Sequence, residues 1–197
     1  MPVYAPEMRG ELANSALELF SQHGLKNVNL DQICAHAGVT KGSLYWHYKS
    51  KKELILAACA QYYRNWQQRA HAEISAAEGP LEQLQRVLRH SVQSCLFDRE
   101  NRLFTSEIFA ASLQDAEIRA SWAQFYDTVR ELFVGLVQAA VTRGQLQVAE
   151  PRRSVDLMLA TIEGIKQRAA FEPQICTPQE RETLVGSLLG IVRTTTP

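Results

Sequence analysis

Residues 39–54 read VTKGSLYWHYKSKKEL and contain four lysines, one histidine and three large aromatic side chains. No acidic residue occurs in this stretch before Glu53. The whole chain of 197 residues carries 21 basic and 21 acidic side chains, so its formal net charge is zero. Affinity for a polyanion must therefore come from a local excess of positive charge, and these lysines can neutralise phosphates.

The residues around this stretch predict two short helices joined by a tight turn. Asn29 and Gln32 have the spacing of a capping box, and Gly38 can adopt the positive φ that ends a helix. Thr40 is a favourable N-cap for a second helix that runs to about Tyr48. This is a helix-turn-helix, whose second helix can enter the major groove of DNA. The residues expected to hold the pair together are Ile33, Ala37, Val39 and Leu44.

The start of the second helix offers groups that can recognise DNA. The side chains of Lys41 and Ser43, with the backbone N–H groups of the first turn, can meet phosphates or base edges. Gly42 lowers helix propensity by about 1 kcal/mol relative to alanine, and it lets the backbone approach DNA. The alternative is an exposed basic helix whose tyrosines only pack against the first helix. The coincidence of the glycine turn, both caps, the aromatics and the lysines favours DNA binding.

A longer run of residues carries a family pattern. The string ALELFSQHGLKNVNLDQICAHAGVTKGSLYWHYKSKKELILAAC has LF and HG in the first helix, AGVTKGSLYWHY across the turn and SKKEL opening the fourth helix. Residues 9–59 thereby resemble the N-terminal domain of TetR-family transcriptional regulators. The resemblance implies a DNA-binding domain in residues 1–55 and a ligand-binding and dimerisation domain in residues 56–197. The DNA contacts that we expect are Asn29, Thr40, Lys41, Gly42, Ser43, Tyr45, Trp46, His47 and Lys51.

Position 48 leaves two alternatives open. Members of the family often have a core phenylalanine there, and this chain has Tyr48. A buried tyrosine and a tyrosine that contacts DNA are both compatible with the sequence.

Helical patterns continue along the rest of the chain, and we find no convincing strand. We expect a long helix over about 51–77, a turn at 98–101 and a shorter helix over about 103–112. Apolar residues recur every three or four positions from Ile118 to Ala140, a pattern typical of helical core. The letters TPQE at 177–180 have the spacing of a capping box before a last helix that ends near Arg193. The predicted fold is all-α: a three-helix helix-turn-helix domain followed by a helical bundle.

The C-terminal bundle is predicted to hold a largely apolar cavity within residues 80–170, because aromatic residues and a few polar ones share its helices. For Glu163, an exposed ion pair with Lys166 is the alternative to a role in the pocket. Gln93 and Glu107 are further polar candidates. The ligand-binding residues that we expect are His90, Phe109, Trp122, Phe125 and Glu163.

Two glycines near the end of the chain indicate a contact between helices. Gly186 and Gly190 lie one helical turn apart, so two helix backbones can approach closely there. We expect homodimerisation through residues about 151–195, and close packing within one subunit is the alternative.

Several other classes of protein are disfavoured. No apolar run approaches the roughly 20 residues of a membrane span, and the first residues lack the order of a signal peptide, so we expect a cytoplasmic protein. Neither a metal-ligand spacing nor a nucleotide loop nor a nucleophile signature is present, so no cofactor and no enzymatic activity are expected. The four cysteines lie far apart and read as thiols in a reducing compartment.

The sequence thus predicts a ligand-responsive transcriptional regulator: a dimeric repressor that leaves its double-stranded DNA operator when a small organic ligand binds. The alternatives are a DNA protein without a ligand, a helical enzyme with an incidental basic surface, and a thiol sensor that uses Cys95 or Cys176.

Overall fold

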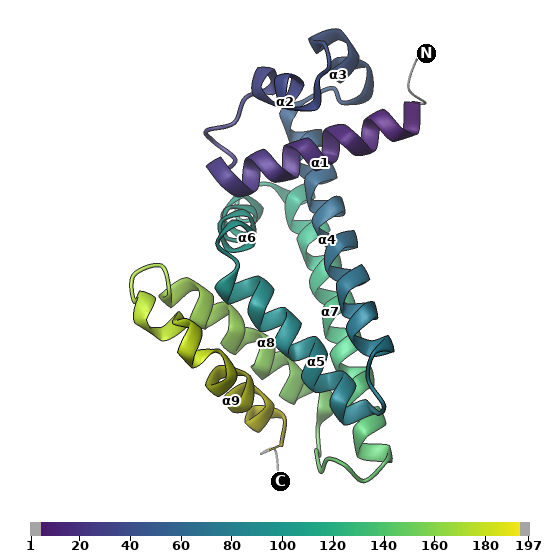
Figure 1. Cartoon of the computed structure of the whole chain (residues 1–197), viewed down its shortest axis with the longest axis vertical. Helices are drawn as coiled ribbons and strands as arrows, with labels where there is room; N and C mark the ends of the chain where they lie inside the picture. Colours follow the sequence, from purple (N-terminus) through teal and green to yellow (C-terminus); the bar gives the residue numbers. More distant parts are fainter. Residues whose placement is uncertain (1–4, 194–197) are drawn as a thin grey trace. The chain divides into compact units, whose positions relative to one another are not determined.

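The computed structural model describes residues 5–193, and this range folds into helices without a strand (Figure 1). The all-α prediction is confirmed. The α-helices are α1 (Ala5–His23), α2 (Leu30–Ala37), α3 (Lys41–His47), α4 (Lys51–Ser75), α5 (Pro80–Val92), α6 (Arg99–Ser112), α7 (Ala116–Thr142), α8 (Pro151–Arg168) and α9 (Arg181–Arg193). A π-helical turn, η1 (Gln93–Phe97), follows α5, and two 3₁₀ turns, η2 (Pro173–Cys176) and η3 (Pro178–Glu180), precede α9.

The chain forms two compact units. The first contains the residues up to 66 together with 103–122, and the second contains 67–102 together with the residues from 123 onward. The helix-turn-helix therefore shares its unit with parts of α6 and α7 from the middle of the chain. The domain boundary expected at residue 55 stays a prediction.

The helix-turn-helix forms through the local interactions that its sequence indicates. The Asn29 side chain accepts from the Gln32 backbone N–H (2.9 Å), and the Gln32 side chain accepts from the Asn29 N–H (2.7 Å). Gly38 adopts φ 66°, a left-handed conformation that disfavours side chains. The Thr40 hydroxyl accepts from the Ser43 N–H at 3.2 Å. Both caps and the glycine turn are thus confirmed.

Two later helix boundaries differ from the prediction. The side chain of Asp98 accepts from the backbone N–H of Asn101 at 3.0 Å, so the polar run predicted as a turn instead opens α6. The capping box predicted at TPQE is wrong. Its residues form a 3₁₀ turn in which the backbone carbonyl of Thr177, and not its hydroxyl, accepts from the Glu180 N–H at 2.9 Å.

Tyr48 belongs to the core of the first unit. Its side chain is buried, and its hydroxyl donates a 2.9 Å hydrogen bond to the backbone carbonyl of Arg9 in α1. The Arg9 guanidinium lies 5.2 Å from the centre of the Tyr48 ring. Leu44, one turn earlier, is also fully buried. These two side chains anchor α3 to the rest of its unit, and they resolve the alternatives at position 48.

We expect Tyr48→Phe to lower the free energy of unfolding by about 1 kcal/mol, because the buried hydroxyl makes one net-stabilising hydrogen bond. Urea denaturation followed by circular dichroism measures this change. The matched control is Tyr45→Phe, at an exposed position of α3, which should change stability by less than about 0.5 kcal/mol. Equal effects of the two substitutions would contradict the role of the Tyr48 hydroxyl.

Candidate nucleic-acid interface

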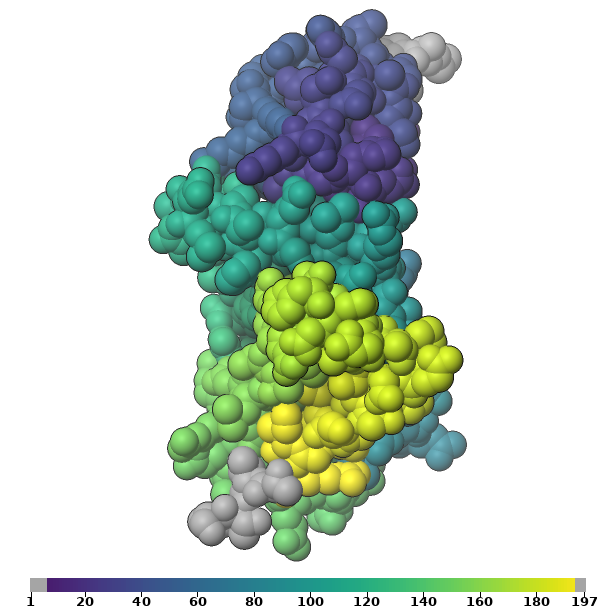
Figure 2. Space-filling model, turned by 90° about the vertical axis from the view of Figure 1, so that its left-hand side faces the viewer, coloured from purple at the N-terminus to yellow at the C-terminus, as the bar shows by residue number. Residues whose placement is uncertain are grey.

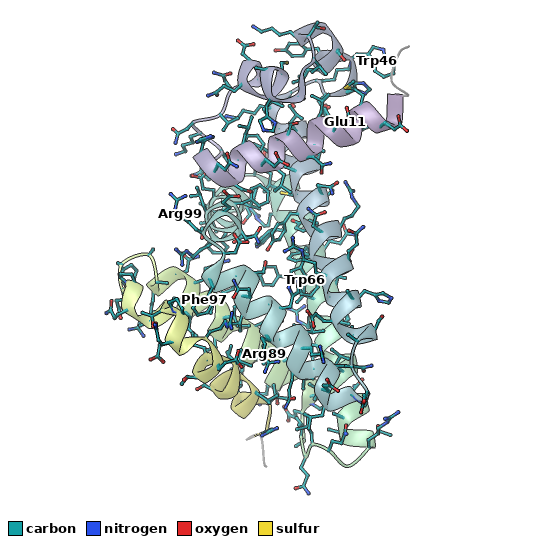
Figure 3. All side chains as sticks on the ribbon, viewed as in Figure 1. Glu11, Trp46, Trp66, Arg89, Phe97 and Arg99 are labelled. Atoms are coloured by element: carbon teal, nitrogen blue, oxygen red, sulfur yellow. The ribbon has the colours of Figure 1, made fainter. Side chains whose placement is uncertain are left out.

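Helix α3 presents large aromatic side chains to solvent. Tyr45 is 48% exposed and Trp46 is 67% exposed, while Leu44 between the turn and these residues is buried. The Trp46 and His47 rings meet edge to face, with centroids 4.5 Å apart. Figure 3 labels Trp46. The rings of Tyr45 and Trp46 occupy neighbouring exposed positions outside the core of the unit. Exposed aromatic rings side by side are typical of a binding surface.

The other expected DNA contacts lie around this surface with different degrees of exposure. Lys41, Gly42, Asn29 and Thr40 are exposed, whereas Ser43 and His47 are half-buried. Because the oxygens of Asn29 and Thr40 cap the helices, these side chains are held in defined positions at the starts of α2 and α3.

An ion pair that sequence reasoning missed joins the two helices of the motif. The ammonium nitrogen of Lys41 lies 2.6 Å from Oδ1 of Asp31, in the first turn of α2. Hydrogen bonding to Asp31 raises the pKa of Lys41 above its usual value. Both side chains are exposed, and a contact of Lys41 with DNA would require it to exchange this carboxylate for a phosphate or a base edge. No periodicity relates positions 31 and 41, and the sequence therefore carried no signal for the pair.

The lysines at the start of α4 have partners within the same unit. The Lys51 ammonium lies 6.0 Å from the centre of the Phe20 ring. Partial burial lowers the pKa of Lys51 below its usual value, and the nearby carboxylate of Glu107 opposes this shift. Lys52 forms ion pairs with Asp115 (2.9 Å) and Glu117 (2.8 Å). The start of α4 is thereby tied to the residues around the α6–α7 junction.

Glu107 of α6 contacts the turn that follows α1. Its carboxylate accepts a hydrogen bond from the backbone N–H of Leu25. The neighbouring Gly24 has φ 83°, and a Cβ at this position would lie 2.5 Å from Oε1 of Glu107. Glycine therefore allows the carboxylate to approach the backbone. The sequence indicates Glu107 only as a pocket candidate, because nothing local links it to a residue 82 positions away.

Among the expected ligand residues, Trp122 lies in an aromatic cluster of the first unit. Its ring centroid is 6.0 Å from that of Tyr63, and Tyr62 lies 5.6 Å from Phe104. These rings come from α4, α6 and α7, and Trp122 is buried. Phe109 lies on α6 with 41% of its surface exposed.

The remaining expected ligand residues belong to the second unit. Phe125 is buried on α7, with its ring 6.1 Å from that of Tyr126. Glu163 forms the ion pair with Lys166 at 2.7 Å, but the Lys166 side chain is only 1% exposed, so the pair is not the exposed one that the sequence suggested. A buried ammonium requires such a carboxylate.

His90 lies on a polar hollow of about 550 Å³ in the second unit. The apolar cavity expected within residues 80–170 stays a prediction, because the side chains around this hollow are charged or polar. They are Glu73, Glu82, Gln85, Arg86, Arg89, His90, Gln93 and Arg181.

The cysteines form no disulfide within the described residues. Burial raises the pKa of Cys59 to about 12 and that of Cys95 to about 11, which disfavours reactive thiolates there. Across residues 5–193 we find no cluster of side chains suited to a metal ion and no helix apolar and long enough to span a membrane.

Two family models match the chain. The model of bacterial regulatory proteins of the tetR family matches residues 12–58, and that of the C-terminal domain of BetI-type transcriptional repressors matches residues 80–191. The chain belongs to the TetR family. It is therefore a helix-turn-helix transcriptional repressor with a BetI-type C-terminal domain, in a family without enzymatic activity.

Individual relatives agree with this assignment. The chain is 28% identical over 179 residues to the transcriptional regulator AcrR of Shigella flexneri, covering 86% of this chain and 81% of the relative. It is 32% identical over 95 residues to BetI of Agrobacterium fabrum, covering 48% and 46%. A putative transcriptional regulator from Saccharomonospora viridis in complex with choline superimposes with a TM-score of 0.83, at 17% identity and covering 96% and 97%. This last likeness supports the fold.

We expect Asp31→Asn to strengthen binding to random-sequence duplex DNA by about three- to tenfold. The substitution releases Lys41 for a phosphate and removes a negative charge near the DNA, so the salt slope should steepen by about one unit. Fluorescence anisotropy at several salt concentrations measures both quantities.

The matched control is Glu18→Gln, which also removes one exposed negative charge, in this case from a pair with His36 on α2. Equal changes in the two variants would show an effect of net charge alone and would contradict a specific competition between Asp31 and DNA.

Proposed function

We propose that this protein is a cytoplasmic homodimer that represses transcription from a double-stranded DNA operator, and that a small organic effector releases it. The observation that carries the proposal is the exposed Lys41, Tyr45 and Trp46 surface on a capped and anchored α3. Residues 1–55 are the proposed DNA-binding domain, and residues 56–197 the proposed ligand-binding and dimerisation domain. The nine DNA contacts expected from the sequence are part of this proposal.

An aromatic effector site is supported by the cluster around Trp122. Rings of Trp and Tyr bind quaternary ammonium groups through cation–π attraction. The regulator from Saccharomonospora viridis is described in complex with choline, which carries such a group. Choline is therefore the first effector that we would test. The other residues that the sequence indicates, His90, Phe109, Phe125 and Glu163, stay individual ligand candidates within this proposal.

Release from DNA is supported by the contacts around Glu107. Two recognition helices of a dimer must fit major grooves about 34 Å apart, one helical turn of DNA. An effector that moves α6 would disturb the hydrogen bond to Leu25 and thus the position of α1 and the motif that follows it. Coupling of about 1–3 kcal/mol weakens operator binding about 5–150-fold.

The proposed dimer interface comprises α8 and α9, which pack side by side. A Cβ on Gly186 or Gly190 would meet no atom of another element of the described chain within 4 Å, which argues against close packing within the subunit. Leu157 of α8 is 49% exposed. Figure 2 shows residues from the end of α8 through α9, lime to yellow, at the surface.

We expect choline to weaken binding to a duplex operator selected from a random pool by about 5–150-fold, measured by fluorescence anisotropy. Trp122→Phe should reduce this response and leave operator affinity without choline within about threefold, since phenylalanine keeps an apolar aromatic ring at this position. The matched control is Trp66→Phe, which alters a buried tryptophan of a different helix, α4. If Trp122→Phe abolishes operator binding without choline, Trp122 is structural core and the proposed effector site fails.

We expect the Gly186→Leu, Gly190→Leu double variant to sediment as a monomer or to misfold, because the added side chains hold two α9 helices apart. Analytical ultracentrifugation with circular dichroism distinguishes these outcomes. The matched control replaces Gly135 by leucine, because this helical glycine of α7 likewise has space around the position that a Cβ would occupy. A folded double variant that sediments as the parent dimer would refute the interface.

A further inference from the structure

The hollow beside α5 differs in character from an effector site made of aromatic rings. Its lining combines three arginines with two glutamates, two glutamines and His90. The residues come from the end of α4, from one face of α5 and η1, and from the first residue of α9. All of them belong to the second compact unit.

The arginines of this hollow are not equally neutralised. Arg86 has two carboxylates, Glu82 at 2.8 Å and Glu73 at 3.8 Å. Arg89 and Arg181 instead share the single carboxylate of Glu182 (Figure 3 labels Arg89). This part of the hollow therefore carries two guanidinium charges for one carboxylate.

The shared carboxylate is also held loosely. Nε of Arg89 lies 3.2 and 3.3 Å from the two oxygens of Glu182, and Nε of Arg181 lies 3.6 Å from one of them. Charge-assisted hydrogen bonds between a guanidinium and a carboxylate are normally about 2.7–2.9 Å long. The remaining partner of Arg181 is neutral: its Nη1 donates to the side-chain oxygen of Gln93 at 3.1 Å.

Donor groups remain for an incoming ligand. Within the described residues, the two Nη groups of Arg89 and Nη2 of Arg181 make no hydrogen bond. A guanidinium presents its N–H groups in a planar fork that matches a carboxylate, and two forks side by side match a ligand with more than one carboxylate. The amides of Gln85 and Gln93 can bond further oxygens of such a ligand.

We propose that this hollow binds a small organic acid with two or three carboxylates, held by Arg89 and Arg181 in competition with Glu182. His90 is the one residue that the hollow shares with the effector residues proposed above, and the present proposal does not depend on that effector. Its binding is therefore measured on the full-length protein without DNA, with citrate as the probe.

Isothermal titration at about 0.15 M ionic strength tests the site, because salt at this concentration screens long-range attraction. We expect citrate to bind the parent protein with Kd of about 1 mM or tighter. Arg89→Gln with Arg181→Gln should weaken binding at least about tenfold. Glu182→Gln, which removes the competing carboxylate, should strengthen it about threefold or more.

The matched control is Arg64→Gln with Arg69→Gln, which removes two exposed arginines of α4 that do not line the hollow. This control should bind citrate as the parent does. Absence of citrate binding to the folded parent protein overturns the proposal. So does an equal loss in both double variants, or weaker binding after Glu182→Gln, since either result shows attraction to net charge and not to this site.

Discussion

The seven-residue helix α3 exists only because its two ends and its inner face are held by the rest of the first unit. Isolated helices shorter than about 12–15 residues are marginal in water. Here the Thr40 hydroxyl caps the start, and the buried Leu44 and Tyr48 fasten the inner side. With the inner side committed to the core, the outward positions carry the exposed rings of Tyr45 and Trp46. The exposed surface that we propose for DNA binding is thus a consequence of how α3 is stabilised.

Carboxylates accompany two lysines of the first unit, and this pairing balances part of its positive charge. Lys41 is paired with Asp31, and Lys52 with Asp115 and Glu117. Exposed pairs of this kind contribute only about 0–1 kcal/mol each, so a phosphate can replace the carboxylate at small cost. The positive charge of these two lysines is therefore balanced in the free protein.

Glu107 gives the family's two regions a physical connection within one compact unit. It belongs to the segment that matches the BetI-type C-terminal domain, yet its carboxylate bonds the backbone of the turn before α2. Gly24 suits this approach, because a Cβ there would lie 2.5 Å from Oε1 of Glu107 and the carboxylate would have to move. A residue whose position depends on both regions is well suited to transmit a change from one to the other.

The sequence by itself determined the features that arise from neighbouring residues. These features involve residues only a few positions apart, so the local sequence is enough to predict them. They are the capping box of Asn29 and Gln32, the left-handed Gly38, the Thr40 cap and the family pattern around them. The approximate extents of most helices follow from the same local periodicity. The tertiary structure decided which distant groups meet: Glu107 with Leu25, Asp31 with Lys41, and the arginines of α5 and α9 around Glu182. It also decided that Lys166 is buried with Glu163. Such contacts depend on how helices pack across long stretches of chain, and packing leaves no signal in the local order of residues.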